Sequence, residues 1–202
     1  MKKGLLIIIS GPSGSGKGTV LAHIIKDKEH FYYSVSATTR KMRPNDVDGV
    51  TYLFISREEF EKKIARGEML EYAEYVGNLY GTPQEPIDKA LDAGKNVILE
   101  IETQGALKVM AKRPDAISIM LVPPDAKTLR DRLSKRETEN EETIARRLKQ
   151  AEFELSHFND YDYVVINRDD ADEDAAKEIL GIIKAEAAKT SRNGDVKENY
   201  FT

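Results

Sequence analysis

One stretch near the start of the chain, LLIIISGPSGSGKGTV at residues 5–20, constrains the fold most. Its unbroken apolar run predicts a strand at 5–10 that is buried on both faces of a parallel sheet, and the glycine-rich turn opens a predicted helix at 17–28. Glycines in such a turn let backbone N–H groups converge on phosphate oxygens, while the helix N-terminus and the lysine add positive charge. The stretch therefore predicts a phosphate-binding P-loop made of Gly11, Pro12, Ser13, Gly14, Ser15, Gly16, Lys17, Gly18 and Thr19.

The loop departs from the usual GxxxxGK[ST] form, because Gly18 follows the lysine and the hydroxyl comes one residue later, at Thr19. GTPase switches place that hydroxyl on Mg²⁺ and use it to sense the γ-phosphate. Without it, the metal would be held by phosphates and water, with carboxylates in the outer shell. The chain also contains no NKxD motif for reading a guanine base in GTPase style. The loop thus indicates a nucleoside triphosphate and favours a small-molecule kinase over a switch.

Further buried strands alternate with helices and predict an α/β fold, a three-layer P-loop core whose parallel sheet is flanked by helices. Strands are expected at 31–36, 50–56, 96–101, 116–122 and 163–166, and an amphipathic helix at 171–189. The tail beyond this helix shows no strong period and is expected to be loosely ordered.

The polar block at 37–82 interrupts this rhythm with short antiparallel pieces. Ser56 and Glu59 form a capping-box pattern at the start of a helix that Gly67 ends, and residues 68–82 predict a hairpin. Pro83 is expected at the first position of the next helix. The sequence therefore predicts a core domain of 1–36 and 83–202, a small mixed α/β lobe at 37–82, and a helical lid at about 125–150.

Composition narrows the class of protein. The 202 residues are 40% hydrophobic and 33% charged, which suits a globular enzyme or binding module. The 31 basic and 35 acidic residues give a net charge of −4, which disfavours a nucleic-acid partner. With no cysteine, disulfides and thiolate chemistry are excluded, and the longest apolar run is too short for a membrane span. A cytoplasmic protein without a membrane partner is expected.

An arginine pair in the polar block suggests what accepts the phosphate. Arg40 and Arg43 flank Lys41 on a loop, and two guanidinium forks match a phosphate monoester dianion in charge and geometry. Tyr52 and Tyr80 belong to the same lobe and offer phenolic donors. Two arginines so close in sequence are commonly just exposed to solvent. The pair therefore counts as evidence for a phosphate site only together with the motifs around it.

That pattern resembles the guanylate kinase family. The matching segments are SVSATTRKMRPNDVDGVTYLF, EMLEYAEYVGNLYGTP, EIETQG and KRETENEETIARRL, which together with the P-loop cover about residues 4–183. The resemblance implies transfer of the γ-phosphoryl of ATP to GMP, with dGMP as a further acceptor, in purine nucleotide metabolism. It also implies Mg²⁺ bound with ATP, closure of the lid and the GMP lobe, and a monomer or homodimer.

The resemblance implies roles for single residues. Ser36 and Thr82 would donate to guanine O6, Glu71 would accept from guanine N1–H and N2–H, and Glu102 would lie towards the guanine amino group. The GMP site would further contain Arg40, Arg43, Asp46, Tyr52, Tyr80 and Gly81, with the arginines and tyrosines on the phosphate. Glu100 would lie in the outer shell of the metal. Catalysis would fall to Lys17, Arg132, Arg136 and Arg147, and Asn167 would lie beside the adenine.

The chemistry of guanine supports the assignment of Glu71. Adenine lacks the N1–H, so it would leave a buried carboxylate unpaired, and such a site can reject the wrong base by ~10⁴-fold. Two rival readings remain at this stage. One is an adenylate- or thymidylate-type kinase, which the set of Ser36, Glu71 and Thr82 disfavours. The other is a non-catalytic, guanylate-kinase-like peptide-binding domain, which the intact P-loop disfavours.

Four positions depart from the family pattern: Asp46 replaces a Glu, Glu102 an Asp, Glu137 a lid Gly, and Arg168 an Asp. None of them removes a phosphate-handling group. The shorter Asp46 is expected to make a water-bridged contact, and Glu137 to stiffen the lid turn beside Arg136.

Overall fold

A computed structural model describes residues 2–75, 77–134 and 141–200 of the chain. It confirms the α/β class, with a parallel five-stranded sheet flanked by helices and a second sheet of four short strands. The chain divides into two compact units, one built from Met1–Ser10 and Asp27–Ser118, the other from Gly11–Lys26 and Ile119–Thr202. The predicted lobe at 37–82 falls within the first unit, and its exact limits stay a prediction.

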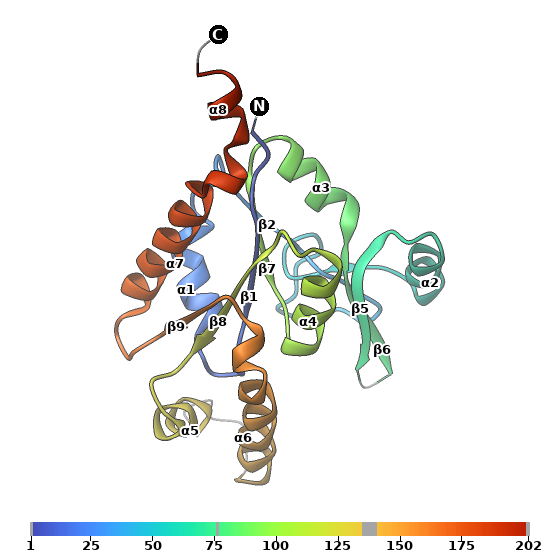
Figure 1. Ribbon diagram of the computed structural model, residues 1–202. Helices are drawn as coiled ribbons and strands as arrows, with labels where there is room; N and C mark the ends of the chain where they lie inside the picture. Colours follow the sequence, from blue (N-terminus) through green and yellow to red (C-terminus); the bar gives the residue numbers. More distant parts are fainter. Residues whose placement is uncertain (1, 76, 135–140, 201–202) are drawn as a thin grey trace. The chain divides into compact units, whose positions relative to one another are not determined.

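In the first unit, three strands pair in parallel in the order β2 (Phe31–Tyr33), β7 (Asn96–Glu100) and β1 (Leu6–Ser10). Every residue of β1 is buried, as its unbroken apolar run predicts. Helix α3 (Gln84–Asp92) packs against β7, and α4 (Thr103–Lys112) packs against β1 and β5 (Figure 1). Because the strands run the same way, their carboxyl ends share one edge of the sheet, where ligands bind in open α/β folds.

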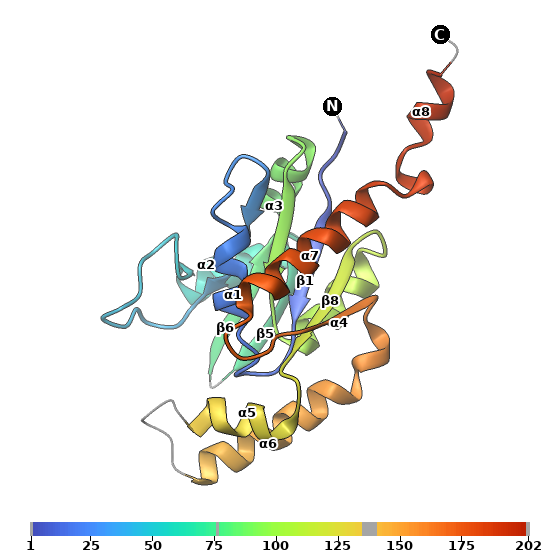
Figure 2. The same ribbon diagram turned by 90° about the vertical axis from the view of Figure 1, so that its left-hand side faces the viewer.

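The lobe of the first unit has strand order β4-β3-β6-β5. Its elements are β3 (Ala37–Thr38), β4 (Leu53–Phe54), α2 (Arg57–Ala65), β5 (Met69–Tyr75) and β6 (Asn78–Pro83). The predicted hairpin is confirmed as β5 and β6, and Ser56 caps α2 by accepting a hydrogen bond from the Glu59 N–H at 3.1 Å. Phe60 and Met69 belong to a small apolar core of the lobe, and the loop between β3 and β4 extends away from it (Figure 2).

In the second unit, residues 119–122 of β8 (Ile117–Val122) pair in parallel with β9 (Tyr163–Ile166), and α1 (Lys17–Ile24) lies beside α7 (Asp172–Ala187). The predicted lid region contains α5 (Ala126–Ser134) and the start of α6 (Glu141–Ser156), which pack side by side (Figure 2). Leu133 and Ile144 are among the buried residues between these two helices. A short 3₁₀ turn at Phe158–Asp160 leads from α6 towards β9.

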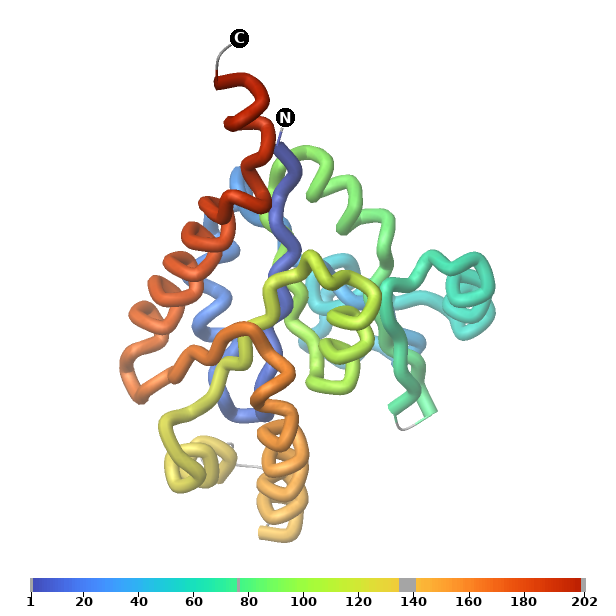
Figure 3. The backbone as a smooth tube through the Cα atoms, viewed as in Figure 1, coloured from blue at the N-terminus to red at the C-terminus, as the bar shows by residue number. Residues whose placement is uncertain are grey.

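The structure corrects several predicted bounds. Helix α1 ends at Ile24, the last buried residue of its apolar face, and not at residue 28. The strands expected at 31–36 and 50–56 shorten to β2 and β4. Pro83 is the N-cap of α3 and not its first residue, because it still pairs with Met69 and keeps an extended ψ of 133°. In the tail, the structure adds a 3₁₀ turn at Thr190–Arg192 and helix α8 (Gly194–Glu198), neither of which contains a buried residue (Figure 3).

Candidate functional site

The glycine loop that leads into α1 has a backbone that only glycine can form. Gly11, Gly14 and Gly16 have φ values of 141°, 92° and 87°, in the left-handed region. A Cβ on Gly11 would lie 2.0 Å from the Leu121 carbonyl oxygen, and one on Gly16 would lie 2.3 Å from Asn167 Nδ2. The loop therefore excludes side chains where it curves most tightly, as a backbone that wraps an anion requires.

Lys17 begins α1 and turns its side chain back onto this loop. Its Nζ donates to the Gly11 carbonyl at 2.6 Å and to the Pro12 carbonyl at 3.3 Å. The first turn of α1 carries no acidic residue, so the positive end of the helix and the ammonium reinforce each other. Gly18 is exposed, and among the residues that the structure describes none would lie within 4 Å of a Cβ there. The described residues therefore leave space for a hydroxyl at this position.

Two side chains, one from α5 and one from the residue that follows β9, hydrogen-bond to the loop and so brace it. Asn167 is only 4% exposed and donates from Nδ2 to the Ser15 carbonyl at 2.9 Å. Arg132, on α5, donates to the Ser15 carbonyl at 3.3 Å and to the Asn167 carbonyl at 2.9 Å. Arg132 also donates from Nη2 to Asp169 Oδ1 at 2.7 Å. Arg132, predicted to act on the transferring phosphoryl, therefore ties the loop to the 167–169 segment in this structure.

A cavity of about 270 Å³ adjoins the brace within the second unit. Its lining consists of Gly14, Gly16, Thr19, Arg132, Asn167, Arg168, Asp169, Asp170 and Asp172. The structure thus brings the predicted adenine-side Asn167 together with the loop glycines and Thr19.

Of the predicted lid arginines, Arg147 on α6 reaches the loop, where its Nη1 donates to Ser13 Oγ at 3.3 Å. Arg136 and Glu137 lie outside the described residues. The second unit therefore places the loop, Lys17 and the two described arginines of the predicted lid region, Arg132 and Arg147, around the same turn.

The first unit contains a cavity of about 280 Å³ of its own. It is lined by Ser36, Tyr52, Glu71, Ala73, Tyr75, Tyr80, Gly81, Glu100, Ile101, Glu102, Gln104 and Gly105. Seven of these residues were predicted for the GMP site or the metal, although they come from separate stretches of sequence. Of the remaining predicted residues, Arg40, Arg43, Asp46 and Thr82 are not part of this lining.

Glu71, on β5, places a carboxylate against this cavity and is only 7% exposed. Thr82, its partner across the hairpin, donates from Oγ1 to Glu71 Oε1 at 2.7 Å. Burial raises the pKa of Glu71, while the hydrogen bond from Thr82 and the charges of Lys108 and Lys112 oppose that rise. A carboxylate held in this way is an acceptor that discriminates strongly between ligands with and without N–H groups.

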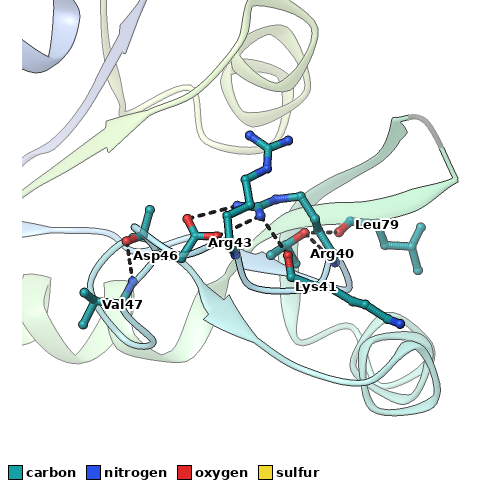
Figure 4. A network of polar contacts seen from close by, with 8 residues as sticks. Arg40, Lys41, Arg43, Asp46, Val47 and Leu79 are labelled. Atoms are coloured by element: carbon teal, nitrogen blue, oxygen red, sulfur yellow. Dashed lines mark hydrogen bonds and ion pairs between the residues drawn. The ribbon is translucent and has the colours of Figure 1, made fainter.

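Arg40 is held by the Asp46 carboxylate, as Figure 4 shows, and also lies beside two aromatic rings. Its Nη1 and Nη2 donate to Asp46 at 2.8 and 3.2 Å, and its Cζ lies 5.5 Å from the ring centroids of both Tyr52 and Phe54. The Arg43 N–H donates to the same Asp46 carboxylate at 2.6 Å. These bonds hold the pKa of Asp46 below its usual range, the Arg40 bond most strongly. Asp46 thus contacts Arg40 directly, and Figure 4 shows the Arg43 guanidinium turned away from it.

Glu100 ends β7 and is held by a residue that sequence reasoning missed. Tyr33, on the neighbouring strand β2, donates its hydroxyl to Glu100 Oε2 at 2.8 Å. Burial raises the pKa of this tyrosine, and the adjacent carboxylate raises it further, so the phenol stays protonated. The rule that parallel strands end at one edge was the signal that could have found the pair.

Three other residues were missed because they look like solvated charge in the sequence. Asp169 pairs with Arg132, while Lys108 and Lys112 of α4 donate to backbone carbonyls of β5. The i,i+4 spacing of the two lysines places both on one face of the helix, but nothing in the sequence shows which strand that face meets.

Comparisons with known proteins identify the family of this chain. The family model described as guanylate kinase matches residues 3–186. A guanylate kinase of Lactococcus lactis is 52% identical over 191 residues, 95% of this chain and 92% of the relative. One of Streptococcus pneumoniae is 52% identical over 185 residues, 91% of this chain and 88% of the relative. The crystal structure of guanylate kinase from Anaplasma phagocytophilum superposes with a TM-score of 0.75 at 34% identity, covering 99% of this chain and 97% of that one.

In the part of the chain that the structure describes, no helix combines the length and the apolar character needed to cross a membrane.

Proposed function

The chain belongs to the guanylate kinase family and phosphorylates GMP with ATP, and on this premise we propose that the cavity of its first unit binds GMP and the glycine loop of its second unit binds ATP. The observation that carries the first assignment is the buried carboxylate of Glu71, which Thr82 holds against a cavity of about 280 Å³. Guanine offers two adjacent N–H donors, and such a carboxylate is their matching acceptor.

In the proposed base site, Glu71 accepts from guanine N1–H and N2–H, and Glu102 lies towards the amino group. Thr82 has one hydroxyl proton, which it gives to Glu71. We therefore assign Thr82 to positioning the carboxylate, and Ser36, which lines the same cavity, to donating towards guanine O6. Thr82 would reach O6 only by releasing Glu71.

In the proposed phosphate site, Arg40 and Arg43 bind the GMP phosphate together with the hydroxyls of Tyr52 and Tyr80. The two tyrosine rings meet edge to face, with centroids 5.8 Å apart. A carboxylate beside a phosphate dianion would repel it, so Asp46 serves by fixing Arg40 and not by contacting the ligand. The paired strands of this lobe span Ala37 to Pro83, which supports domain limits within one residue of the proposed 37–82.

On the ATP side, the loop N–H groups from Gly11 to Thr19 would surround the phosphates, Lys17 would bind the β- and γ-phosphate oxygens, and the base would lie near Asn167. The cavity beside the loop supports this placement. Phosphoryl transfer needs two phosphates in line and positive charge on the equatorial oxygens, so closure of the GMP lobe and the lid belongs to the proposal.

The charge at the transferring group comes from Lys17 and from arginines of the lid. Arg147 already contacts the loop, and Arg136 is proposed from the family pattern alone. Arg132 would act there only after leaving Asp169 and the loop carbonyls, so we assign it first to holding the loop in shape. A transition-state arginine of this kind contributes ~10³- to 10⁵-fold in rate.

The donor set fits Mg²⁺ bound with ATP. Mg²⁺ keeps several waters and is commonly held by one or two carboxylates together with substrate phosphates. Glu100 offers one carboxylate, oriented by Tyr33, and the described residues include no cluster of three or more acidic or histidine ligands. When bound, the metal would neutralise charge on the phosphates, with Glu100 in its outer shell.

We further propose a cytoplasmic enzyme, monomeric or homodimeric, that also accepts dGMP and binds neither nucleic acid nor membranes. The composition without cysteine and the net charge of −4 support this setting.

Initial-rate kinetics with GMP, dGMP, AMP and dTMP against ATP and Mg²⁺ test the proposal. We expect ADP release with GMP and dGMP, and a kcat/KM for AMP at least ~10⁴-fold lower. Comparable rates with AMP would refute the assignment of the base site, and undiminished rates after chelation of Mg²⁺ would refute the metal.

A further inference from the structure

Two lysines of α4 attach that helix to the strand carrying Glu71. Lys112 Nζ donates to the Leu70 carbonyl at 2.6 Å, and Lys108 Nζ donates to the Tyr72 carbonyl at 2.8 Å. These carbonyls belong to the residues on either side of Glu71. Strand β5 is an edge strand of its sheet, and α4 runs along it (Figure 1). The ammonium groups thus occupy acceptors that a neighbouring strand would otherwise fill.

The pairing of β5 with β6 is irregular at this point. Met69 pairs with Pro83 and Glu71 with Thr82, so Leu70 is an extra residue on β5, a β-bulge. Bulges disrupt the ladder locally and re-aim the neighbouring side chain, and they occur preferentially beside functional sites. Here the bulge sets the direction of Glu71, and Lys112 holds the carbonyl of the bulged residue itself.

The same face of α4 meets the Glu71 side chain. A Cβ on Gly105 would lie 3.2 Å from Glu71 Oε2, so the helix approaches the carboxylate closely. Gly105, Lys108 and Lys112 follow i, i+3, i+7 spacing, which places them on one side of the helix. One face of α4 therefore restricts the space beside the Glu71 carboxylate and holds the backbone carbonyls of the residues before and after Glu71.

We propose that Lys108 and Lys112 are positioning residues that hold the bulge of β5 and thereby aim the Glu71 carboxylate at the guanine base. This inference rests on the proposed role of Glu71 in reading guanine. The two charges also oppose the rise in the pKa of Glu71 that burial causes, and so favour the carboxylate over the acid.

A purely structural role for the lysines predicts a different outcome. Lysines often protect an edge strand against pairing with other chains, and such protection affects solubility or stability but not the kinetics of one substrate. A positioning role instead raises the KM for GMP, leaves the KM for ATP unchanged, and requires Glu71 to be present.

The test compares Lys108→Met, Lys112→Met and the double variant with Lys95→Met. Lys95 also donates its ammonium to a backbone carbonyl, that of Lys28 at 2.8 Å, but it does not line the base cavity. We expect each α4 variant to raise the KM for GMP by about 3- to 10-fold, with the double variant highest. The KM for ATP should change by less than about 2-fold in all variants, and Lys95→Met should match the wild type.

Lys112→Arg keeps a charged donor and should restore most of the GMP affinity. If Lys112→Met folds poorly in a thermal melt, Lys108→Met still tests the idea, because Lys108 is exposed. Unchanged GMP kinetics in Lys108→Met and in every folded Lys112 variant would overturn the inference.

Repeating the lysine variants in a Glu71→Gln background separates the two proposals. We expect their effect on GMP to shrink to within about 2-fold there, because the group that they aim is altered. A lysine effect of full size in that background would overturn the positioning role. If Glu71→Gln alone left the GMP kinetics unchanged, the proposed base site would fail instead.

Discussion

The glycine loop of the second unit and the cavity of the first unit, proposed to bind ATP and GMP, are built by opposite means. The loop is one contiguous stretch whose backbone forms the site, and the close approach at Gly11 excludes any side chain. The cavity is assembled from side chains of distant segments, and its main acceptor, Glu71, is held by Thr82 from another strand. A site made of backbone groups is determined by one short stretch of sequence. A site made of side chains also depends on the residues, distant in sequence, that hold those side chains in place.

The largest effect is expected at the loop. Lys17→Ala removes the ammonium that lies against the loop, and kcat should fall by about 10³-fold or more. GMP binding to this variant, measured by calorimetry, should stay within about 2-fold of the wild type, because the lysine belongs to the other unit. A large loss of GMP affinity would contradict the proposal that ATP and GMP bind to separate sites.

A smaller effect is expected at the phosphate end of the cavity. Asp46→Asn removes the ionic partner of Arg40 while leaving the two flanking rings in place. The KM for GMP should rise by about 10-fold, equivalent to about 1.4 kcal/mol, and the preference for GMP over AMP should persist. A change in base preference measured with both substrates would show that Asp46 acts on the base as well.

The pH dependence should also differ between the two sites. Burial raises the pKa of Glu71 in the folded protein, so GMP affinity should fall with decreasing pH from a point above the ordinary glutamate pKa of about 4.3. The KM for ATP should lack this acid limb. Persistence of the same limb in Glu71→Gln would assign it to another group.

The same shift has a consequence for stability. A raised folded-state pKa means that the contribution of Glu71 to stability is full below the ordinary pKa and is lost as the pH rises through the raised value. At neutral pH, therefore, Glu71→Gln should leave the melting temperature unchanged or raise it. A clear drop in thermal melts at pH 7 would contradict the sign of the shift.

The smallest effect is expected at Gly18. A Cβ at this position would meet none of the described residues, so Gly18→Ser should change kcat by less than about 3-fold. This variant adds the hydroxyl that switch proteins use to sense the γ-phosphate. A loss of tenfold or more in initial rates would mean that the proposed holding of Mg²⁺ by phosphates is wrong.

The contrast between the two sites also explains what the sequence alone could predict. The strand, loop and helix around Lys17 follow from local chemistry, as does the cap of α2 at Ser56. The segments that line the cavity were predicted from the resemblance to a family. Three residues that hold cavity side chains or the backbone beside them were not predicted. Tyr33, Lys108 and Lys112 act through contacts across strands and a helix, which hydrophobic period and spacing do not specify. The bounds of short strands such as β4 depend on the same tertiary pairing.

The most direct test of the account measures kcat/KM for GMP and for AMP in the wild type and in Glu71→Gln. The wild type should strongly prefer GMP, and the variant should lose about 10²-fold or more with GMP while its rate with AMP stays the same or rises. Such a result would show that the buried carboxylate of the first unit reads the guanine base. An equal loss with both substrates, or no loss with GMP, would contradict this central claim.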